Sequence, residues 1–183
     1  MNRLFVAIDL PDEVKNAIDG IVSRALDGAR LVPREQLHLT LRFIGDGDEK
    51  IFEAIKKELG SIRATPFSLT LKGAGHFPRG REPSVLWVGM EENGPLLDLQ
   101  KKIEQSIVNA GIAADERRFS PHITIARLRE TPLAQVASLE EQHRQFRAGP
   151  FHVEEFYLYS SVLTRDGAIH KREAVYRLEP GTR

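Results

Sequence analysis

Two short segments decide how this chain is organised: His38-Leu39-Thr40-Leu41 and His122-Ile123-Thr124-Ile125. In both, a histidine and a threonine alternate with two aliphatic residues. Side chains two positions apart on a strand point to the same face, so each segment predicts a strand with a His–Thr pair on one face and an apolar anchor on the other. The second segment follows the first by nearly half the chain, which predicts a duplicated unit with two lobes.

The sequence around these segments alternates between strand-like and helix-like patterns. We expect strands near residues 4–8, 37–43, 67–71, 85–90, 122–125, 151–158 (extending towards 163) and 174–178, and helices beginning near Pro11, Asp46 or Asp48, Asn93 and Pro132. This order is neither a regular βαβ alternation nor an all-β series, and it predicts an α+β fold with largely antiparallel sheets and helices outside. The repeated motif makes the fold bilobal, and if the halves pack about a pseudo-twofold axis, the sheets line a central cleft between the two His–Thr pairs. No disordered linker interrupts residues 1–183, so we expect a single bilobal domain with halves centred on His38 and His122.

Composition narrows the classes of function. The 183 residues include 26 basic and 26 acidic side chains and no cysteine. Balanced charge argues against coating long nucleic acids by charge alone, although it allows a local basic pocket. Without cysteine there is no disulfide scaffold, thiol nucleophile or Cys-ligated zinc. No signal peptide or membrane-spanning run is apparent, so we expect a soluble, cytoplasmic protein without a membrane partner.

Two histidines facing one cleft suit acid–base chemistry at phosphorus. The imidazole titrates near neutrality, so one histidine can remove a proton while the other supplies one. Threonine hydroxyls can donate hydrogen bonds to non-bridging phosphate oxygens. The scheme needs no metal or other cofactor. A single histidine on a strand is more often structural, however, and the repeat on its own leaves the catalytic and structural interpretations about equally weighted.

The two motifs resemble the signature of the two-histidine phosphoesterase superfamily, and more closely that of the RNA 2′,3′-cyclic phosphodiesterases, also named 2′–5′ RNA ligases. The likeness extends along nearly the whole chain. It includes Arg3-Leu4-Phe5-Val6-Ala7-Ile8-Asp9-Leu10-Pro11, residues 38–45, Val85-Leu86-Trp87-Val88-Gly89, Ser120-Pro121-His122 and residues 158–164.

The resemblance implies a metal-independent phosphodiesterase that opens a terminal RNA 2′,3′-cyclic phosphate to a 2′-phosphomonoester, with reversible 2′–5′ RNA ligation as a further activity. By motif position, His38 would be the general acid and His122 the general base, an assignment that could also be reversed. Thr40 and Thr124 would bind phosphate oxygens, and Arg127 would contact the substrate phosphate. The implied partner is an RNA with a cyclic phosphate end, such as a tRNA fragment, bound by a monomer.

Strict alternation conflicts with part of this assignment. It places Arg127 on the face opposite His122, so a β-bulge or the strand end must redirect it. It also places Arg42 beside His38 and Thr40, and makes Phe43 a core residue, although Phe43 falls where a family aromatic can contact the base.

Other patterns carry less information. The stretch from Gly73 to Gly80 lacks the third glycine of a dinucleotide loop and predicts a hairpin connection. Trp87 is expected in the core, and zinc would need a third ligand beside the two motif histidines. We expect the remaining histidines to be structural or surface residues; these are His76, His143, His152 and His170. Two short basic patches could guide an RNA end, one formed by Arg79 and Arg81 and the other by Arg117 and Arg118. The alternative to an enzyme is a module of the same fold that binds a nucleotide or RNA end without turnover.

Overall fold

Two antiparallel sheets form the framework of the protein. The computed structural model describes residues 3–22 and 26–180. In chain order the elements are β1 (Arg3–Asp9), α1 (Asp12–Ile21), β2 (Ala29–Leu31), the short 3-10 helix η1 (Arg34–Gln36), β3 (His38–Asp46), α2 (Glu49–Gly60), β4 (Phe67–Arg79), β5 (Glu82–Met90), α3 (Gly94–Asn109), β6 (Ile123–Leu128), α4 (Leu133–Gln142), β7 (Arg147–Val153), β8 (Glu155–Thr164) and β9 (Gly167–Arg177).

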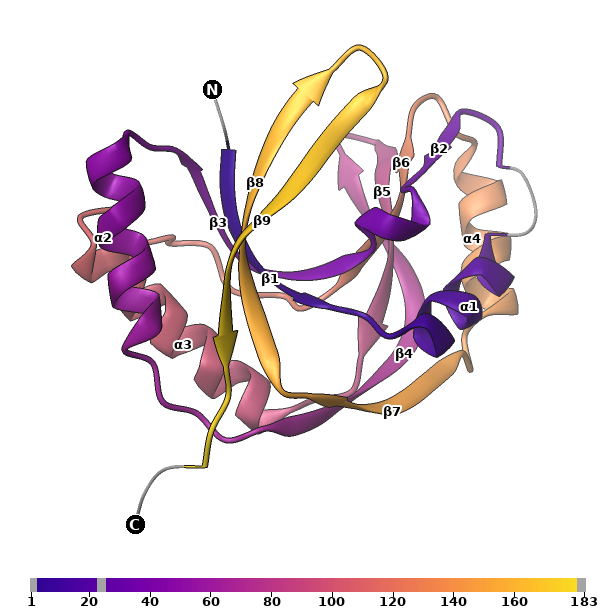
Figure 1. Cartoon of the computed structure of the whole chain (residues 1–183). Helices are drawn as coiled ribbons and strands as arrows, with labels where there is room; N and C mark the ends of the chain where they lie inside the picture. Colours follow the sequence, from indigo (N-terminus) through magenta and orange to yellow (C-terminus); the bar gives the residue numbers. More distant parts are fainter. Residues whose placement is uncertain (1–2, 23–25, 181–183) are drawn as a thin grey trace.

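The sheets repeat one topology. The first has the strand order β3-β1-β8-β9 and the second β2-β6-β5-β4-β7. Apart from β2, the strands correspond pairwise, with β3 equivalent to β6, β1 to β5, β8 to β4 and β9 to β7. The two motif strands β3 and β6 therefore occupy equivalent places, and the bilobal, pseudo-twofold α+β arrangement predicted from the sequence is confirmed (Figure 1).

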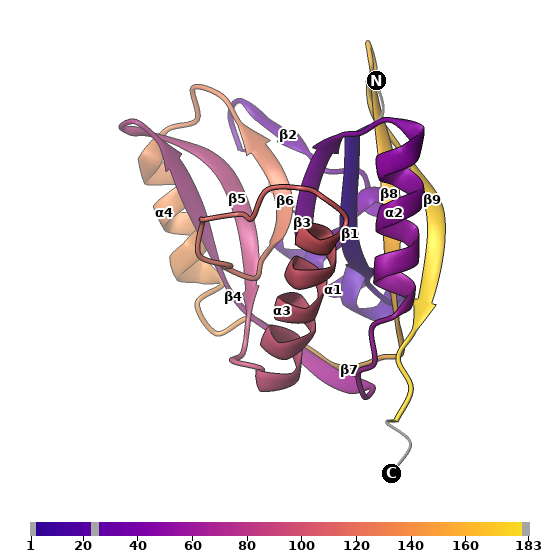
Figure 2. The same cartoon turned by 90° about the vertical axis from the view of Figure 1, so that its left-hand side faces the viewer.

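Helices cover the outside of both sheets, as expected. Helices α2 and α3 pair on one side of the molecule, and α1 and α4 lie on the other (Figures 1 and 2). Helix α2 is capped by Asp48, whose carboxylate accepts a hydrogen bond from the Ile51 amide at 2.9 Å, one of the two predicted caps. Helix α3 begins after Asn93, whose side chain caps it in the same way.

Strand β1 runs through the middle of the first sheet. All of its residues from Leu4 to Ile8 are buried, which explains the unbroken apolar run in the sequence. Strands β3 and β8 flank it on its two edges. This strand is the rigid base on which the His38 motif is placed.

The structure confirms one predicted connection and corrects another. The hairpin connection predicted for Gly73 to Gly80 is confirmed, because β-bulges and a turn at Gly80 absorb the glycines and prolines of this stretch within paired strands. The expected strand over residues 151–158 is two strands that separate at Glu154, where the chain passes from the second sheet to the first. Short strands such as β2 were also not anticipated.

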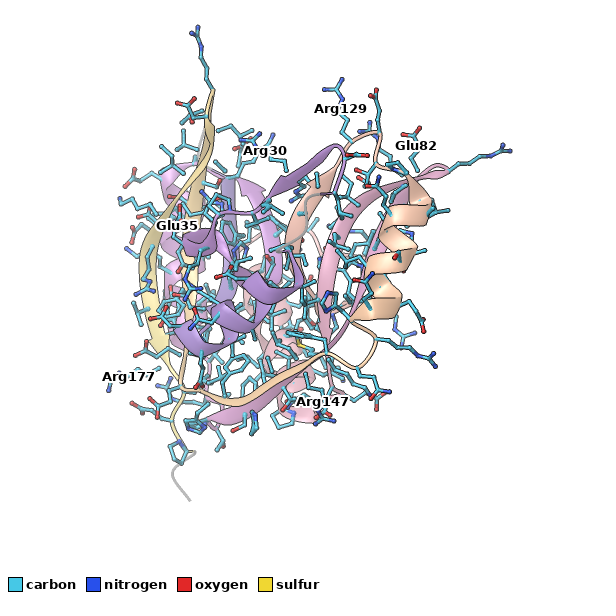
Figure 3. The ribbon with its side chains drawn as sticks, turned by 90° about the vertical axis from the view of Figure 1, so that its right-hand side faces the viewer. Arg30, Glu35, Glu82, Arg129, Arg147 and Arg177 are labelled. Atoms are coloured by element: carbon cyan, nitrogen blue, oxygen red, sulfur yellow. The ribbon has the colours of Figure 1, made fainter. Side chains whose placement is uncertain are left out.

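Charged side chains of both signs surround the molecule. Figure 3 shows, for example, Glu82, Arg147 and Arg177 projecting from different strands. This mixture agrees with the zero net charge of the sequence. Within residues 3–22 and 26–180, no helix has the length and apolar character needed to cross a membrane.

Candidate active site

A β-bulge at the same position of each motif aims the functional side chains. On β3, Thr40 pairs with Ala7 and Arg42 pairs with Val6, so Leu41 is an extra residue without a partner on β1. On β6, Thr124 pairs with Trp87 and Ala126 pairs with Leu86, so Ile125 is the extra residue. One added residue reverses the alternation beyond it. The fifth residue after each histidine therefore returns to the face of the histidine.

This bulge resolves the conflict at Arg127, since it brings that side chain to the same face as Thr124. It also makes two expectations from strict alternation wrong. Arg42 does not share the face of Thr40: it is only 7% exposed and forms an ion pair with Glu104 of α3 at 2.5 Å. Phe43 is not a core residue, because 56% of it is exposed and it lines the cleft.

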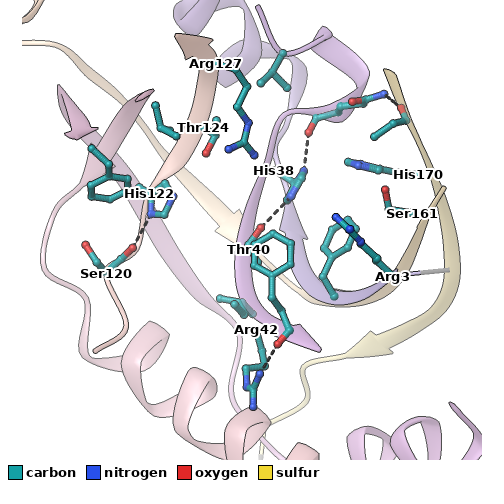
Figure 4. A pocket seen from close by; sticks show the side chains of 18 of the residues that line it. Arg3, His38, Thr40, Arg42, Ser120, His122, Thr124, Arg127, Ser161 and His170 are labelled. Atoms are coloured by element: carbon teal, nitrogen blue, oxygen red, sulfur yellow. Dashed lines mark hydrogen bonds between the residues drawn. The ribbon is translucent and has the colours of Figure 1, made fainter. Parts of the chain in front are cut away.

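The two sheets enclose a cleft of about 870 Å³. All six site residues predicted from the sequence line it: His38, Thr40, Phe43, His122, Thr124 and Arg127. In the close view, His38 and Thr40 lie on one side and His122 and Thr124 on the other, with Arg127 between them (Figure 4). A volume of this size accommodates a nucleotide-sized ligand.

Both histidines are held in the same tautomer. The Nδ1 atom of His38 lies 2.6 Å from the Gln36 carbonyl, and that of His122 lies 2.7 Å from the Ser120 carbonyl. A carbonyl oxygen only accepts hydrogen bonds, so each Nδ1 carries a proton and donates it. The Nε2 atom is then the nitrogen that can exchange protons in each ring. In neutral His38, Nε2 accepts a hydrogen bond from the Thr40 hydroxyl at 3.0 Å.

Aromatic rings enclose His38. Its ring stacks on Phe5 at 5.0 Å, Phe5 stacks on Tyr159 at 5.3 Å, and His170 meets His38 edge-on at 5.5 Å. Burial is the main reason that the pKa of His38 falls to about 4, and the nearby charge of Arg127 acts in the same direction. His38 is therefore neutral at pH 7 in the free site.

His122 has a more open setting. One aromatic ring, that of Phe77 on β4, meets it edge-on at 4.8 Å. The hydrogen bond from Nδ1 to the Ser120 carbonyl orients the ring, as described above. The same motif is thus placed in a tightly packed environment in one lobe and in a more solvated one in the other.

The charges that line the cleft leave basic groups available. Its two carboxylates, Glu104 and Asp115, are each engaged by an arginine, and Arg117 holds the pKa of Asp115 at about 2. An anionic ligand therefore fits the charge of the cleft. Among the described residues, the arginines that line the cleft without an acidic partner are Arg3, Arg30, Arg118 and Arg127.

Sequence reasoning missed several residues of the cleft. His170, expected to be structural or on the surface, lines it together with Arg3, Phe5 and Ser161. None of these shares a motif with the histidines, and only the pairing of β1, β8 and β9 brings them together. Trp87, expected in the core, is half-buried and lies across Gly75, where a Cβ atom would overlap the indole ring.

Some of the histidines and arginines set aside from the sequence lie outside the cleft, whereas His170, Arg117 and Arg118 line it. His76 pairs with Glu140 at 2.5 Å, and His143 and His152 do not line the cleft. Of the two basic patches, Arg117 and Arg118 border the cleft, whereas Arg79 and Arg81 lie at the β4–β5 turn. In the part of the chain that the structure describes, no group of three or more His, Cys, Asp or Glu side chains could hold a metal ion.

Sequence comparison connects the chain with known proteins. Residues 10–165 match the model of the 2′-5′ RNA ligase superfamily. A protein of Thermotoga maritima named RNA 2′,3′-cyclic phosphodiesterase is 36% identical over 174 residues, covering 92% of this chain and 91% of the relative. A protein of the same name from Archaeoglobus fulgidus is 31% identical over 177 residues, covering 95% and 99%.

Solved structures agree with the sequence comparison. Escherichia coli LigT in its apo form is 30% identical, with a TM-score of 0.80 and 98% of each chain covered. The same protein complexed with 3′-AMP gives a TM-score of 0.79 at 30% identity, covering 98% of this chain and 99% of LigT. The protein TT0787 of Thermus thermophilus is 29% identical with a TM-score of 0.78, covering 96% and 97%.

Proposed function

Since the chain belongs to the 2′-5′ RNA ligase superfamily, we propose that it opens terminal RNA 2′,3′-cyclic phosphates to 2′-phosphomonoesters by metal-independent acid–base catalysis. One observation supports this most directly. Two imidazoles from equivalent motifs have the same Nδ1–H tautomer and line one cleft with two threonines and with Arg127, which has no acidic partner among the residues that the structure describes. The relatives named RNA 2′,3′-cyclic phosphodiesterase give the reaction class.

In the proposed reaction, a water oxygen attacks phosphorus and the bond from phosphorus to the 3′ oxygen breaks. Nε2 of His122 takes the proton of the water, and Nε2 of His38 supplies a proton to the departing 3′ oxygen. In-line displacement requires the base and acid on opposite sides of phosphorus, which corresponds to histidines from opposite lobes. The product keeps its phosphate on the 2′ oxygen.

The other motif residues stabilise charge. Thr40 and Thr124 donate hydrogen bonds to the non-bridging oxygens, and Arg127 neutralises charge that develops on them. Phe43 stacks on a base of the substrate. The Thr40 hydroxyl must leave His38 for this role, which frees Nε2 to carry the proton.

His38 acts as the acid only if the substrate raises its low pKa. A phosphate bound between His38 and Arg127 does this in two ways, because it favours the protonated ring and offsets the guanidinium charge that disfavours it. The opposite assignment, with neutral His38 as the base, uses the same groups in reverse. The pH–rate profiles of single variants decide between the two assignments.

The same site can join RNA ends. If the 5′ hydroxyl of a second RNA replaces water, attack on the cyclic phosphate forms a 2′–5′ linkage with the same acid and base. The superfamily description favours this second activity. A module that binds nucleotide without turnover is the competing interpretation, and the intact pair of motifs argues against it.

End-group analysis of RNA products tests the proposal. An oligonucleotide ending in a 2′,3′-cyclic phosphate is incubated with wild-type protein or His122→Ala, with and without EDTA. We expect a 2′-phosphate end from the wild type in both conditions and a strongly reduced yield from the variant. A 3′-phosphate product, loss of activity in EDTA, or tight binding without product would each contradict the proposal.

Further proposals concern the setting of the reaction. RNA, including tRNA fragments, is the proposed substrate, and the cysteine-free composition fits a reducing cytoplasm. We treat residues 1–183 as one domain that acts as a monomer, because both sheets of a single chain contribute to the cleft. Size-exclusion chromatography with light scattering measures the oligomeric state.

A further inference from the structure

A row of three polar side chains crosses the first sheet beside His38. Arg3 on β1 pairs in register with Ser161 on β8, and Ser161 pairs with His170 on β9. Residues opposite each other on antiparallel strands carry their side chains on the same face, roughly 5 Å apart at Cβ. All three line the cleft, so the row faces the same space as the catalytic groups (Figure 4).

The proposed chemistry uses none of the three, and each has hydrogen-bonding capacity to spare. Within the described residues, the Arg3 guanidinium has no acidic partner and the Ser161 hydroxyl has no hydrogen bond. The ring contacts of His170 are with Phe5, His38 and Tyr159, and within the described residues its side chain forms no hydrogen bond. A guanidinium, a hydroxyl and an imidazole in one row are donors that suit a phosphate group.

The position of the row relates it to the reacting phosphate. The His170 and His38 rings are 5.5 Å apart, so the row begins one side chain away from the proposed proton donor. An RNA end brings a second phosphate with it, one nucleotide from the first. A 2′,3′-cyclic mononucleotide without a 5′-phosphate has no second phosphate for the row to bind.

We propose that Arg3, Ser161 and His170 bind the phosphodiester next to the reacting cyclic phosphate, which makes an oligonucleotide rather than a cyclic mononucleotide the preferred substrate. This inference depends on the proposed function and specifies its substrate class. It also accounts for the position of Arg3, which has no acidic partner among the described residues, in a cleft where Arg127 is already assigned to the reacting phosphate.

The test compares two dinucleotides that end in a 2′,3′-cyclic phosphate. One has a normal internucleotide phosphodiester and the other a neutral methylphosphonate linkage. We expect wild-type kcat/KM to favour the charged linkage by about 10- to 100-fold, the size of effect of hydrogen bonds to a charged group. Each enzyme is its own folding control, because the measured quantity is a ratio of two rates from one preparation.

Variants assign the preference to the row. Arg3→Gln should reduce the ratio to about threefold or less, and Ser161→Ala should reduce it by a few-fold. Arg165→Gln removes the same charge from the exposed tip of the β8–β9 hairpin, outside the cleft, and should keep the wild-type ratio. An unchanged ratio in Arg3→Gln would overturn the assignment.

The outcomes distinguish a failure of the proposed function from a failure of the proposed phosphodiester site. If wild type opens neither dinucleotide, the proposed function fails. If it opens both equally well, the function stands and the inference fails. A 5′-phosphorylated oligonucleotide without a cyclic end is also tested as a competitor. If Arg3→Gln weakens that inhibition while the linkage preference persists, the row binds a second strand instead, and the claim for the neighbouring phosphodiester is overturned.

Discussion

The two lobes place one motif in two different surroundings. In each lobe, the same bulge follows the threonine and a carbonyl two residues before the histidine orients the ring. His38 is enclosed by aromatic rings and has a lowered pKa, whereas His122 has one aromatic neighbour. The fifth residue after the motif histidine is Phe43 in the first lobe and Arg127 in the second. Duplicated backbone geometry can thus support two distinct chemical roles through neighbouring residues alone.

Replacing either histidine should produce the largest effect. His38→Asn and His122→Asn are each expected to reduce kcat/KM by about 10²- to 10⁴-fold, as for loss of a general acid or base. Asparagine retains an N–H that can reach the backbone carbonyl. Steady-state assays from pH 4 to 9 should show a bell-shaped profile for the wild type and the loss of a different limb in each variant.

His152→Asn, a substitution of an exposed histidine on β7, serves as the control and should leave the profile unchanged. If both catalytic-site variants lost the same limb, the division of acid and base between the lobes would be wrong.

The next largest effect concerns stability at the bulge. Arg42 corresponds to Ala126 in the other lobe, so Arg42→Ala makes the two bulges alike. The change leaves the partly buried carboxylate of Glu104 without its arginine partner. We expect the free energy of unfolding to fall by about 2–3 kcal/mol. This is below the full cost of breaking a buried ion pair, because Glu104 keeps some contact with solvent. Urea denaturation measures it.

Arg117→Ala is the matched control, because Arg117 pairs with Asp115 on the surface. This substitution should lower the free energy of unfolding by roughly 0–1 kcal/mol. Equal losses in the two variants would contradict a structural role specific to Arg42.

Replacing the residue five positions after either motif histidine should affect activity more than stability. Arg127→Gln is expected to lower kcat/KM about 10- to 100-fold by removing a charged donor to the phosphate. Phe43→Leu should raise KM by about fivefold with little change in kcat, since stacking contributes to ground-state binding. Kinetics on one oligonucleotide substrate compare the two. A larger kcat effect for Phe43→Leu than for Arg127→Gln would reverse the roles assigned to these positions.

The smallest expected effect is the pH dependence of stability that His38 contributes. Its pKa is about 4 in the folded protein, below the ordinary value near 6.5, so the unfolded chain binds more protons between these values. Acidification from pH 6.5 to pH 4 therefore destabilises the wild type through this group. The melting temperature of the wild type should fall a few degrees more than that of His38→Asn over this range. Parallel curves would show that burial does not lower this pKa.

Much of the architecture follows from sequence pattern. The unbroken apolar run of β1 predicted a strand buried on both faces. Asn93, and either Asp46 or Asp48, predicted helix starts, which the structure confirms at Asn93 and Asp48. These signals are local, because burial periodicity and capping depend on neighbours a few residues away. The repeated motif predicted four residues that line one cleft, His38, Thr40, His122 and Thr124, and the family resemblance added Phe43 and Arg127.

Predictions failed where register decides the outcome. Alternation placed Arg42 on the face of Thr40 and Phe43 on the core face, and one extra residue in β3 reversed these two orientations. The glycines and prolines between Gly73 and Pro83 predicted a hairpin connection, which the pairing of β4 with β5 confirms, but they did not predict that the paired strands continue through them. A bulge depends on how two strands align, and neither strand encodes that alignment by itself.

By itself, the sequence determined the α+β class, the duplicated motif and the pair of histidines, because each depends on the spacing of residue types along the chain. Tertiary structure alone decided the burial of His38 among aromatic rings, the return of Arg127 to the cleft, and the row of Arg3, Ser161 and His170. These features join residues from strands far apart in the chain. Strand order and register, which arise only when the sheets form, bring them into contact.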